Sequence, residues 1–237
     1  SVVAGWSPRP EYVLLVGDGT RDYLDHGGRG WRNYLPAYLA DADLYEGPFP
    51  AETASDSGLD PGDPLPVFKI GRLPVSSIQQ TQDVVAKIVA YETAPAPGLW
   101  NRYTLFVADN ADAAGQFPLY SDELYASLSP PLAGDRIYLA ADATRLHEYD
   151  IHVPARLEAA RSAVRDYFVA GRQLVVYMGH SSYSQWAAEI LLHRDQVPTL
   201  ANDGRLPVVL SMTCLTAAFH HEAYAPLDER LLLEPRG

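Results

Sequence analysis

The sequence predicts an α/β protein with a doubly wound, mostly parallel sheet that carries helices on both faces. Two observations predict this fold. Short apolar runs alternate with amphipathic segments along the chain. The apolar runs are continuous and do not alternate with polar residues, which is typical of strands buried on both faces.

Six apolar runs are expected to form strands: Tyr12 to Val16, Val67 to Ile70, Tyr103 to Ala108, Arg136 to Ala140, Gln173 to Met178 and Val208 to Met212. The range 77–92 follows two serines that can cap a helix and has apolar residues near helical spacing. The range 154–170 begins with Pro154 and stops before Gly171, the usual asymmetry of helix ends. A shorter helix is expected after Trp186, through Leu192.

The 237 residues suffice for one large α/β domain or two tightly packed subdomains. The stretch 93–98, Thr-Ala-Pro-Ala-Pro-Gly, is the expected boundary between an N-terminal α/β subdomain (1–98) and a C-terminal subdomain (99–237). The stretch 41–66 is rich in Pro, Asp, Gly and Ser and is expected to be a long loop, functional or disordered.

The formal net charge of −12 disfavours contact with phosphate backbones, so we expect no nucleic-acid partner. No apolar run reaches the roughly 18 residues of a membrane span. The chain does not begin with methionine, so we expect it to be part of a longer precursor. Its single cysteine, Cys214, excludes an internal disulfide, and a lone cysteine is most often a small buried hydrophobe.

Polar residues of catalytic type follow three predicted strands. Asp18 follows the first strand, His180 follows the strand 173–178, and Cys214 follows the strand 208–212. Cys214 lies 34 residues after His180, about one strand–helix–strand crossover. Ligands of open α/β sheets bind beyond the carboxyl ends of the strands, so imidazole and thiol are expected at one sheet edge.

A histidine beside a cysteine points to nucleophilic catalysis. The imidazole promotes the thiolate nucleophile and can then protonate a leaving amine. Backbone N–H groups at a strand-to-loop turn can hold the oxyanion. The residues alone leave open a second interpretation, in which a buried thiol and a hydrogen-bonded histidine never meet.

Several segments resemble one peptidase family. Residues 177–181, Tyr-Met-Gly-His-Ser, and 211–214, Ser-Met-Thr-Cys, resemble the two active-site signatures of the gingipain-like cysteine peptidases of the caspase-like clan. Further segments resemble that family in its own order: 13–19, 53–56, 69–75, 91–92 and 107–110. The similarity runs from about Tyr12 to Leu233 and implies a caspase-like fold with two adjoining subdomains.

The resemblance implies a cysteine endopeptidase with a His180–Cys214 dyad that needs no cofactor for its chemistry. The backbone N–H groups of Ser181 and Cys214 would form the oxyanion hole. The family usually has glycine where Ser181 stands, and tends to have glycine where Ala217 or Ala218 stands. Family members usually continue well beyond the nucleophile, so the 99–237 subdomain is expected to be truncated at its C-terminal end.

The resemblance also implies further site residues. Asp56 lies in a segment that matches a pocket loop of arginine-specific gingipains, which predicts cleavage after Arg or Lys; it can equally be a solvated turn residue. Asp18 and Glu52 are candidates for orienting His180, although Asp18 can instead brace the turn after the first strand. Trp186 is a candidate wall of the substrate cleft, or an anchor for the segment that follows it.

Family structures also suggest calcium, for which the loop from Asp56 to Asp63 is a candidate, although it lacks an EF-hand pattern. The implied partner is a protein or peptide substrate, and the implied location is secreted or cell-surface.

Other chemistries fit less well. Asp18-Gly19-Thr20 lacks the nucleophilic aspartate of a phosphatase signature, because Val16 occupies that position. Two His-Glu pairs lack the second histidine of a zinc-peptidase motif. The remaining alternative is a catalytically inactive caspase-like module that serves for binding or as a scaffold.

Overall fold

The structure is a computed structural model that describes residues 5–8, 10–41, 52–55, 69–221 and 223–235; for 38, 40, 41 and 52–55 it describes the backbone alone. The chain divides into two compact units. The first comprises Ser1–Gln82 with Ala218–Ala225, and the second comprises Asp83–Ala217 with Pro226–Gly237. In the described part of the chain, no helix is both long and apolar enough to cross a membrane.

The division between the units differs from the expected boundary at 93–98. It falls inside helix α1 (Ile78–Thr93), because the residues of this helix from Asp83 onward belong to the second unit. There the Lys87 ammonium donates hydrogen bonds to the carbonyl oxygens of Leu232 and Glu234, each at 2.7 Å. Segment 218–225 belongs to the first unit, although the residues on both sides of it belong to the second.

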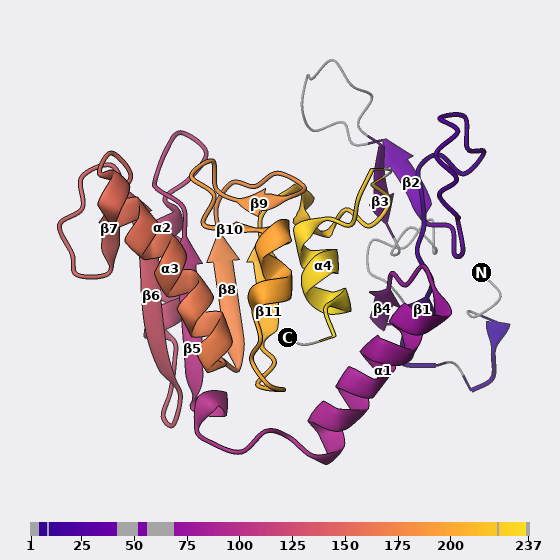
Figure 1. Ribbon diagram of the computed structural model, residues 1–237, viewed down its shortest axis with the longest axis horizontal. Helices are drawn as coiled ribbons and strands as arrows, with labels where there is room; N and C mark the ends of the chain where they lie inside the picture. The colour runs from indigo at the N-terminus through magenta and orange to yellow at the C-terminus, as the bar shows by residue number, and fades with distance from the viewer. Residues whose placement is uncertain (1–4, 9, 42–51, 56–68, 222, 236–237) are drawn as a thin grey trace. The chain divides into compact units, whose positions relative to one another are not determined.

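The second unit contains a five-stranded sheet in the order β11-β8-β5-β6-β7, and all of its neighbouring strands are parallel (Figure 1). Its strands are β5 (Tyr103–Ala108), β6 (Ala133–Ala140), β7 (Glu148–Asp150), β8 (Leu174–Met178) and β11 (Val208–Met212). The central strands β5 and β8 are buried on both faces, as their continuous apolar sequences predict.

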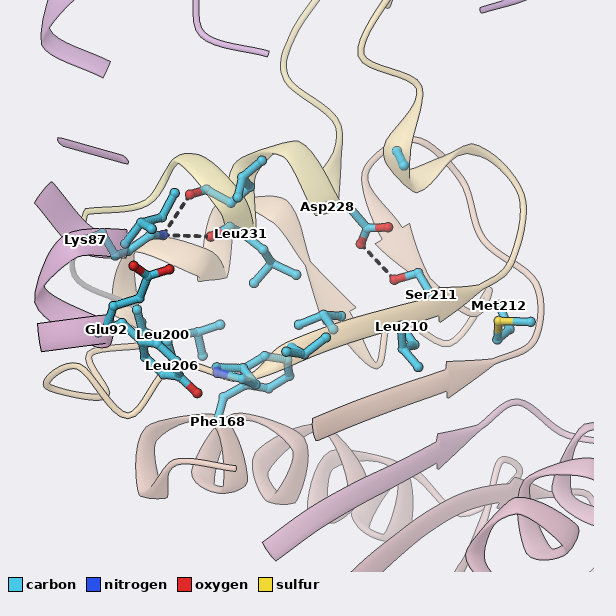
Figure 2. Close-up of a pocket in the computed structure, with 17 residues that line it drawn as sticks. Lys87, Glu92, Phe168, Leu200, Leu206, Leu210, Ser211, Met212, Asp228 and Leu231 are labelled. Carbon is cyan, nitrogen blue, oxygen red and sulfur yellow. Dashed lines mark hydrogen bonds between the residues drawn. The ribbon is translucent and has the colours of Figure 1, made fainter. Parts of the chain in front are cut away.

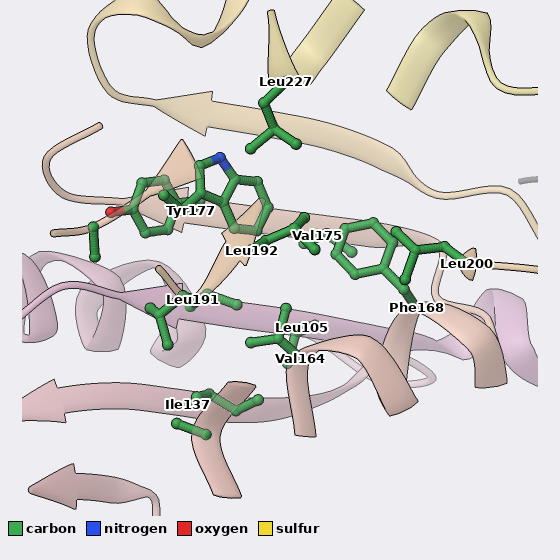
Figure 3. Packing of buried hydrophobic residues seen from close by; sticks show 14 of the residues in the cluster. Leu105, Ile137, Val164, Phe168, Val175, Tyr177, Leu191, Leu192, Leu200 and Leu227 are labelled. Atoms are coloured by element: carbon green, nitrogen blue, oxygen red, sulfur yellow. The ribbon is translucent and has the colours of Figure 1, made fainter. Parts of the chain in front are cut away.

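Helices cover both faces of this sheet (Figure 1). Helix α3 (Pro154–Ala170) packs Val164 and Phe168 against Leu105, Val175 and other side chains of one face (Figure 3). Helix α2 (Phe117–Ala126) lies on the other face, where Phe106 and Val176 are buried. Alternate residues of β5 therefore serve two cores, and the predicted doubly wound fold class is confirmed.

The first unit contains two small sheets. Strand β1 (Tyr12–Val16) pairs in parallel with β4 (Lys69–Leu73), and β2 (Tyr38–Asp41) pairs antiparallel with β3 (Glu52–Ser55). Helix α1 begins as predicted, because the Ser77 hydroxyl accepts a hydrogen bond from the Gln80 N–H at 3.1 Å.

The prediction of a short helix after Trp186, through Leu192, is wrong. Ala187 and Ile190 have φ angles of 57° and 58°, in the left-handed region that interrupts an α-helix. The segment instead forms a small antiparallel pair of β9 (Gln185–Trp186) and β10 (Leu192–His193), followed by the 3-10 helix η4 (Arg194–Thr199).

Candidate active site

The predicted dyad follows two neighbouring parallel strands. Strands β8 and β11 are paired so that Met178 lies opposite Met212. His180 and Cys214 each follow two residues later, so they lie beyond the same edge of the sheet. The Thr213 hydroxyl donates to the Gly179 carbonyl at 2.6 Å and ties the two loops together. Cys214 is exposed, and the His180 side chain is 49% exposed, so both reacting groups are accessible.

The histidine loop needs glycine at position 179. Gly179 has a φ of 152°, and a Cβ added there would lie 2.3 Å from the Cβ of Asp109. The next carbonyl, of His180, accepts hydrogen bonds from the Tyr177 hydroxyl at 2.5 Å and from the Ala187 N–H at 2.9 Å. This close packing fixes the backbone that carries the imidazole.

Asp109 supports the same loop from strand β5. One carboxylate oxygen accepts the His180 N–H at 3.1 Å, and the other accepts the Asn110 N–H at 2.8 Å. Burial raises the pKa of Asp109, and these two N–H donors oppose that rise. Asp109 therefore holds the main chain of His180 and not its ring.

Asp112 contacts the imidazole itself. Its Oδ2 lies 2.9 Å from His180 Nε2, and its Oδ1 accepts the Ala114 N–H at 2.8 Å. The Ala114 N–H, and then the contact with His180, lower the pKa of Asp112. Phe117 of α2 packs edge-on against the His180 ring at 5.3 Å between centroids. The ring is thus bounded by one carboxylate and one aromatic side chain.

Asp112 was not among the residues expected to orient His180. The available signal was the segment 107–110, which ends the strand that lies next to β8. Asp112 stands four residues beyond the end of β5, in a turn closed by a hydrogen bond from its own N–H to the Gly115 carbonyl. Only the pairing of β5 with β8 brings this turn to His180.

The two expected orienting residues belong to the first unit. The Asp18 carboxylate accepts the Gly19 N–H at 2.8 Å, which braces the turn after β1. Burial raises the pKa of Asp18 to about 6, against the opposing effects of Gly19 and Arg72. The backbone of Glu52 pairs with Asp41 in the β2–β3 sheet. Asp56, and the loop to Asp63 considered for calcium, lie outside the described residues.

The structure places Ser181 and Trp186 against each other in an isolated antiparallel bridge. Within the loop 179–182 only Gly179 has a positive φ, so the serine at 181 is not forced into the left-handed region. The Trp186 side chain is fully buried and stacks on Tyr177 at 4.6 Å with an interplanar angle of 7°. The indole therefore packs beneath the histidine loop, inside the core.

A cavity of about 620 Å³ lies beside β11 within the second unit (Figure 2). Its lining is mostly apolar and includes Leu210 and Met212 of β11, Phe168 of α3 and Leu231 of the C-terminal helix. Neither His180 nor Cys214 lines it. The cavity therefore adjoins the strand that leads to the nucleophile without containing the reacting groups.

Among the residues that the structure describes, no group of three or more His, Cys, Asp or Glu side chains is arranged to hold a metal ion.

A family profile and solved structures relate the chain to known proteins. The sequence profile of peptidase family C25 matches residues 1–237. Comparison with curated proteins finds no match. Two solved structures of gingipain R are similar in fold: the crystal structure of the Arg-specific cysteine proteinase RgpB, and the complex of Porphyromonas gingivalis RgpB pro- and mature domains.

The first structure has a TM-score of 0.67 at 19% identity and covers 98% of this chain and 46% of that one. The second has a TM-score of 0.66 at 19% identity, with coverages of 95% and 45%. A third, described only as a protease, has a TM-score of 0.60 at 18% identity, with coverages of 97% and 44%. This chain thus spans less than half the length of the structures it resembles.

Proposed function

The chain belongs to peptidase family C25, and on that premise we propose that it provides the catalytic dyad of a cysteine endopeptidase. One observation carries the proposal. The register of β8 and β11 places His180 and Cys214 two residues beyond the paired residues Met178 and Met212. The two residues therefore follow adjacent strands at one sheet edge, as a nucleophile and its base require, and both side chains are accessible to a substrate.

The proposed reaction uses these two side chains in turn. The Cys214 thiolate attacks the peptide carbonyl carbon, and the backbone N–H groups of Ser181 and Cys214 stabilise the oxyanion. The C–N bond then breaks as His180 gives its proton to the leaving amine. Water, deprotonated by His180, hydrolyses the thioester and restores the thiol.

Asp112 completes this arrangement as the residue that orients the base. Its carboxylate at His180 Nε2 favours one ring orientation and stabilises the imidazolium that forms during acylation. The carboxylate is 41% exposed, so solvent screening limits its effect.

For specificity, we propose cleavage after arginine or lysine. The similarity to an Arg-specific proteinase supports this, and the net charge of −12 suits a cationic substrate. Asp56 is the proposed pocket carboxylate. Asp56→Ala should selectively lose cleavage after Arg and Lys, whereas an unchanged cleavage profile would exclude Asp56 from the pocket.

The competing function is a scaffold that kept the fold and lost turnover. Fluorogenic peptides with Arg, Lys or Ala before the scissile bond distinguish the two in the full-length protein. We expect turnover of the Arg and Lys peptides that disappears in Cys214→Ala. Absence of turnover with a peptide library, in a folded sample, supports the scaffold.

We also propose that the chain is part of a secreted precursor. The gingipain R complex of pro- and mature domains supports a partner of this kind. Mass spectrometry of culture medium tests this, because it should recover peptides of 1–237 in a processed form. Recovery only from the cell interior would contradict secretion.

A further inference from the structure

Two hydroxyl groups on either side of Cys214 donate to one carboxylate. The Ser211 hydroxyl lies 3.0 Å from Asp228 Oδ1, and the Thr216 hydroxyl lies 2.7 Å from Asp228 Oδ2. Ser211 belongs to β11, and Thr216 belongs to the 3-10 helix η5 (Leu215–Ala217), so the nucleophile stands between the two donors. Figure 2 shows the Asp228 carboxylate directed at Ser211.

This contact is largely removed from solvent. Thr216 is 1% exposed, and burial raises the pKa of Asp228 against the opposing hydrogen bonds from Thr216 and Ser211. Each hydroxyl donates to a different oxygen of this carboxylate, so both hydroxyl protons point toward it. The orientation of each donor is thereby fixed.

Asp228 lies in helix α4 (Leu227–Leu233), which is held at both ends. At its start, the Leu227 N–H donates to the carbonyl of Tyr183, three residues after His180. At its end, Lys87 donates to the carbonyls of Leu232 and Glu234. The first turn of α4 therefore contacts the segment after His180 and, through Asp228, the segment around Cys214.

The path of the chain gives this contact a structural role. After Ala217 the chain joins the first unit, and it returns to the second unit at Pro226. Without a contact to hold it, Cys214 would lie just before the eight residues 218–225 that belong to the first unit. Asp228, two residues after the return, bonds to Thr216, two residues before the departure.

We propose that Asp228 is a positioning residue for Cys214. It acts through its hydrogen bonds to Ser211 and Thr216, and we call these two bonds the clamp. The role rests on the proposed peptidase function. The clamp sets the direction of the Cys214 side chain and of its N–H, the proposed oxyanion donor. A misplacement of about 1 Å at a reacting group can cost about 100-fold in rate, so this positioning affects catalysis directly.

The test measures Cys214 reactivity in the full-length protein. An arginyl chloromethylketone reports alignment of the thiolate with a bound peptide, and iodoacetamide reports the reactivity of the thiol alone. Intact mass gives both rates. We compare Asp228→Ala with Asp166→Asn, which changes an exposed carboxylate on α3. A melting curve verifies that each variant is folded at the assay temperature.

We expect Asp228→Ala to slow chloromethylketone labelling about 10- to 100-fold, with a smaller change for iodoacetamide. Asp166→Asn should label at the wild-type rate. Adding Ser211→Ala and Thr216→Val to Asp228→Ala should slow labelling no further, because the three residues act through one contact.

A folded Asp228→Ala variant that labels at the wild-type rate would overturn the positioning role, even with a lower Tm, and leave the proposed function intact. Independent, multiplying effects of the three substitutions would overturn it as well. Wild-type protein that the chloromethylketone fails to label would overturn both proposals. Should Asp228→Ala not fold, Thr216→Val and Ser211→Ala carry the same test, and unchanged labelling of both would reject the clamp.

Discussion

Met178 of β8 lies directly opposite Met212 of β11 in the parallel sheet. Two residues after the end of each strand stand His180, beyond β8, and Cys214, beyond β11. Successive side chains of a strand point to opposite faces, so a register shift of one residue would separate imidazole from thiol. The register of two strands is thus the basis of the proposed dyad.

Asp112→Asn should lower kcat/KM about 10- to 100-fold and leave the fold intact. The amide keeps the size of the side chain but loses the negative charge that lies 2.9 Å from His180 Nε2. The effect should be smaller than for a buried triad aspartate, because Asp112 is partly exposed. Steady-state kinetics with an arginyl peptide provide the measurement.

Asp142→Asn is the matched control, because Asp142 is an exposed carboxylate in the turn after β6. It should retain wild-type kinetics. Equal kinetics for wild type and Asp112→Asn would mean that the carboxylate does not assist His180.

Gly179→Ala should destabilise the protein by about 3 kcal/mol or more and abolish peptide cleavage. The new methyl group would lie 2.3 Å from the Asp109 Cβ and 2.8 Å from the Tyr177 hydroxyl oxygen. Gly98→Ala is the control that separates the steric clash from backbone strain. Gly98 also has a positive φ, but a Cβ added there would lie no closer than 3.8 Å to its nearest neighbouring atom, on Trp100. Chemical denaturation should show a clearly smaller loss for Gly98→Ala; equal losses would argue against a packed histidine loop.

The free energy of unfolding should fall in acid, in part through Glu148. Its burial raises the pKa, but the N–H groups of Thr144 and Arg145 and the Arg145 guanidinium outweigh this and lower the pKa to about 2. A carboxylate with a depressed folded-state pKa stabilises the fold above its unfolded pKa, about 4.5, and loses this contribution as pH falls toward 2. The contribution is about 1–3 kcal/mol after allowance for solvent screening.

Urea denaturation of wild type and Glu148→Gln between pH 2 and 7 tests the contribution of the Glu148 carboxylate to stability. The variant should be less stable than wild type at pH 7, and the difference should shrink as pH falls from 4.5 toward 2. Glu123→Gln, at an exposed position of α2, should follow the wild-type curve. A constant difference between Glu148→Gln and wild type across the range would contradict the assignment.

The central strands could be predicted because their apolar runs reflect burial on both faces. Strands β5 and β11 and helix α3 have the expected bounds. The sequence after Trp186 wrongly predicts a helix, because the mostly apolar stretch 187–192 carries no mark of the left-handed turns at Ala187 and Ile190. Strand β7 is only three residues long, too short for a recognisable pattern.

The candidate site likewise contains residues that the sequence predicts and residues that it does not. His180 follows the buried strand β8, and Cys214 follows the edge strand β11, whose alternate residues are exposed. Both strands have mostly apolar sequences, so sequence patterns locate them. Asp112 and Asp228 lie in a turn and in the first turn of a short helix, and they reach the site only through strand pairing and a chain return. Such long-range contacts leave no local signature in the sequence.

The central claim is tested most directly by the mass of the full-length protein after treatment with an arginyl or lysyl chloromethylketone. The thiolate sulfur should form a thioether as chloride leaves. We expect one adduct on Cys214, lost in Cys214→Ser and abolished by His180→Ala. A folded wild-type protein that no peptide electrophile labels would contradict the account.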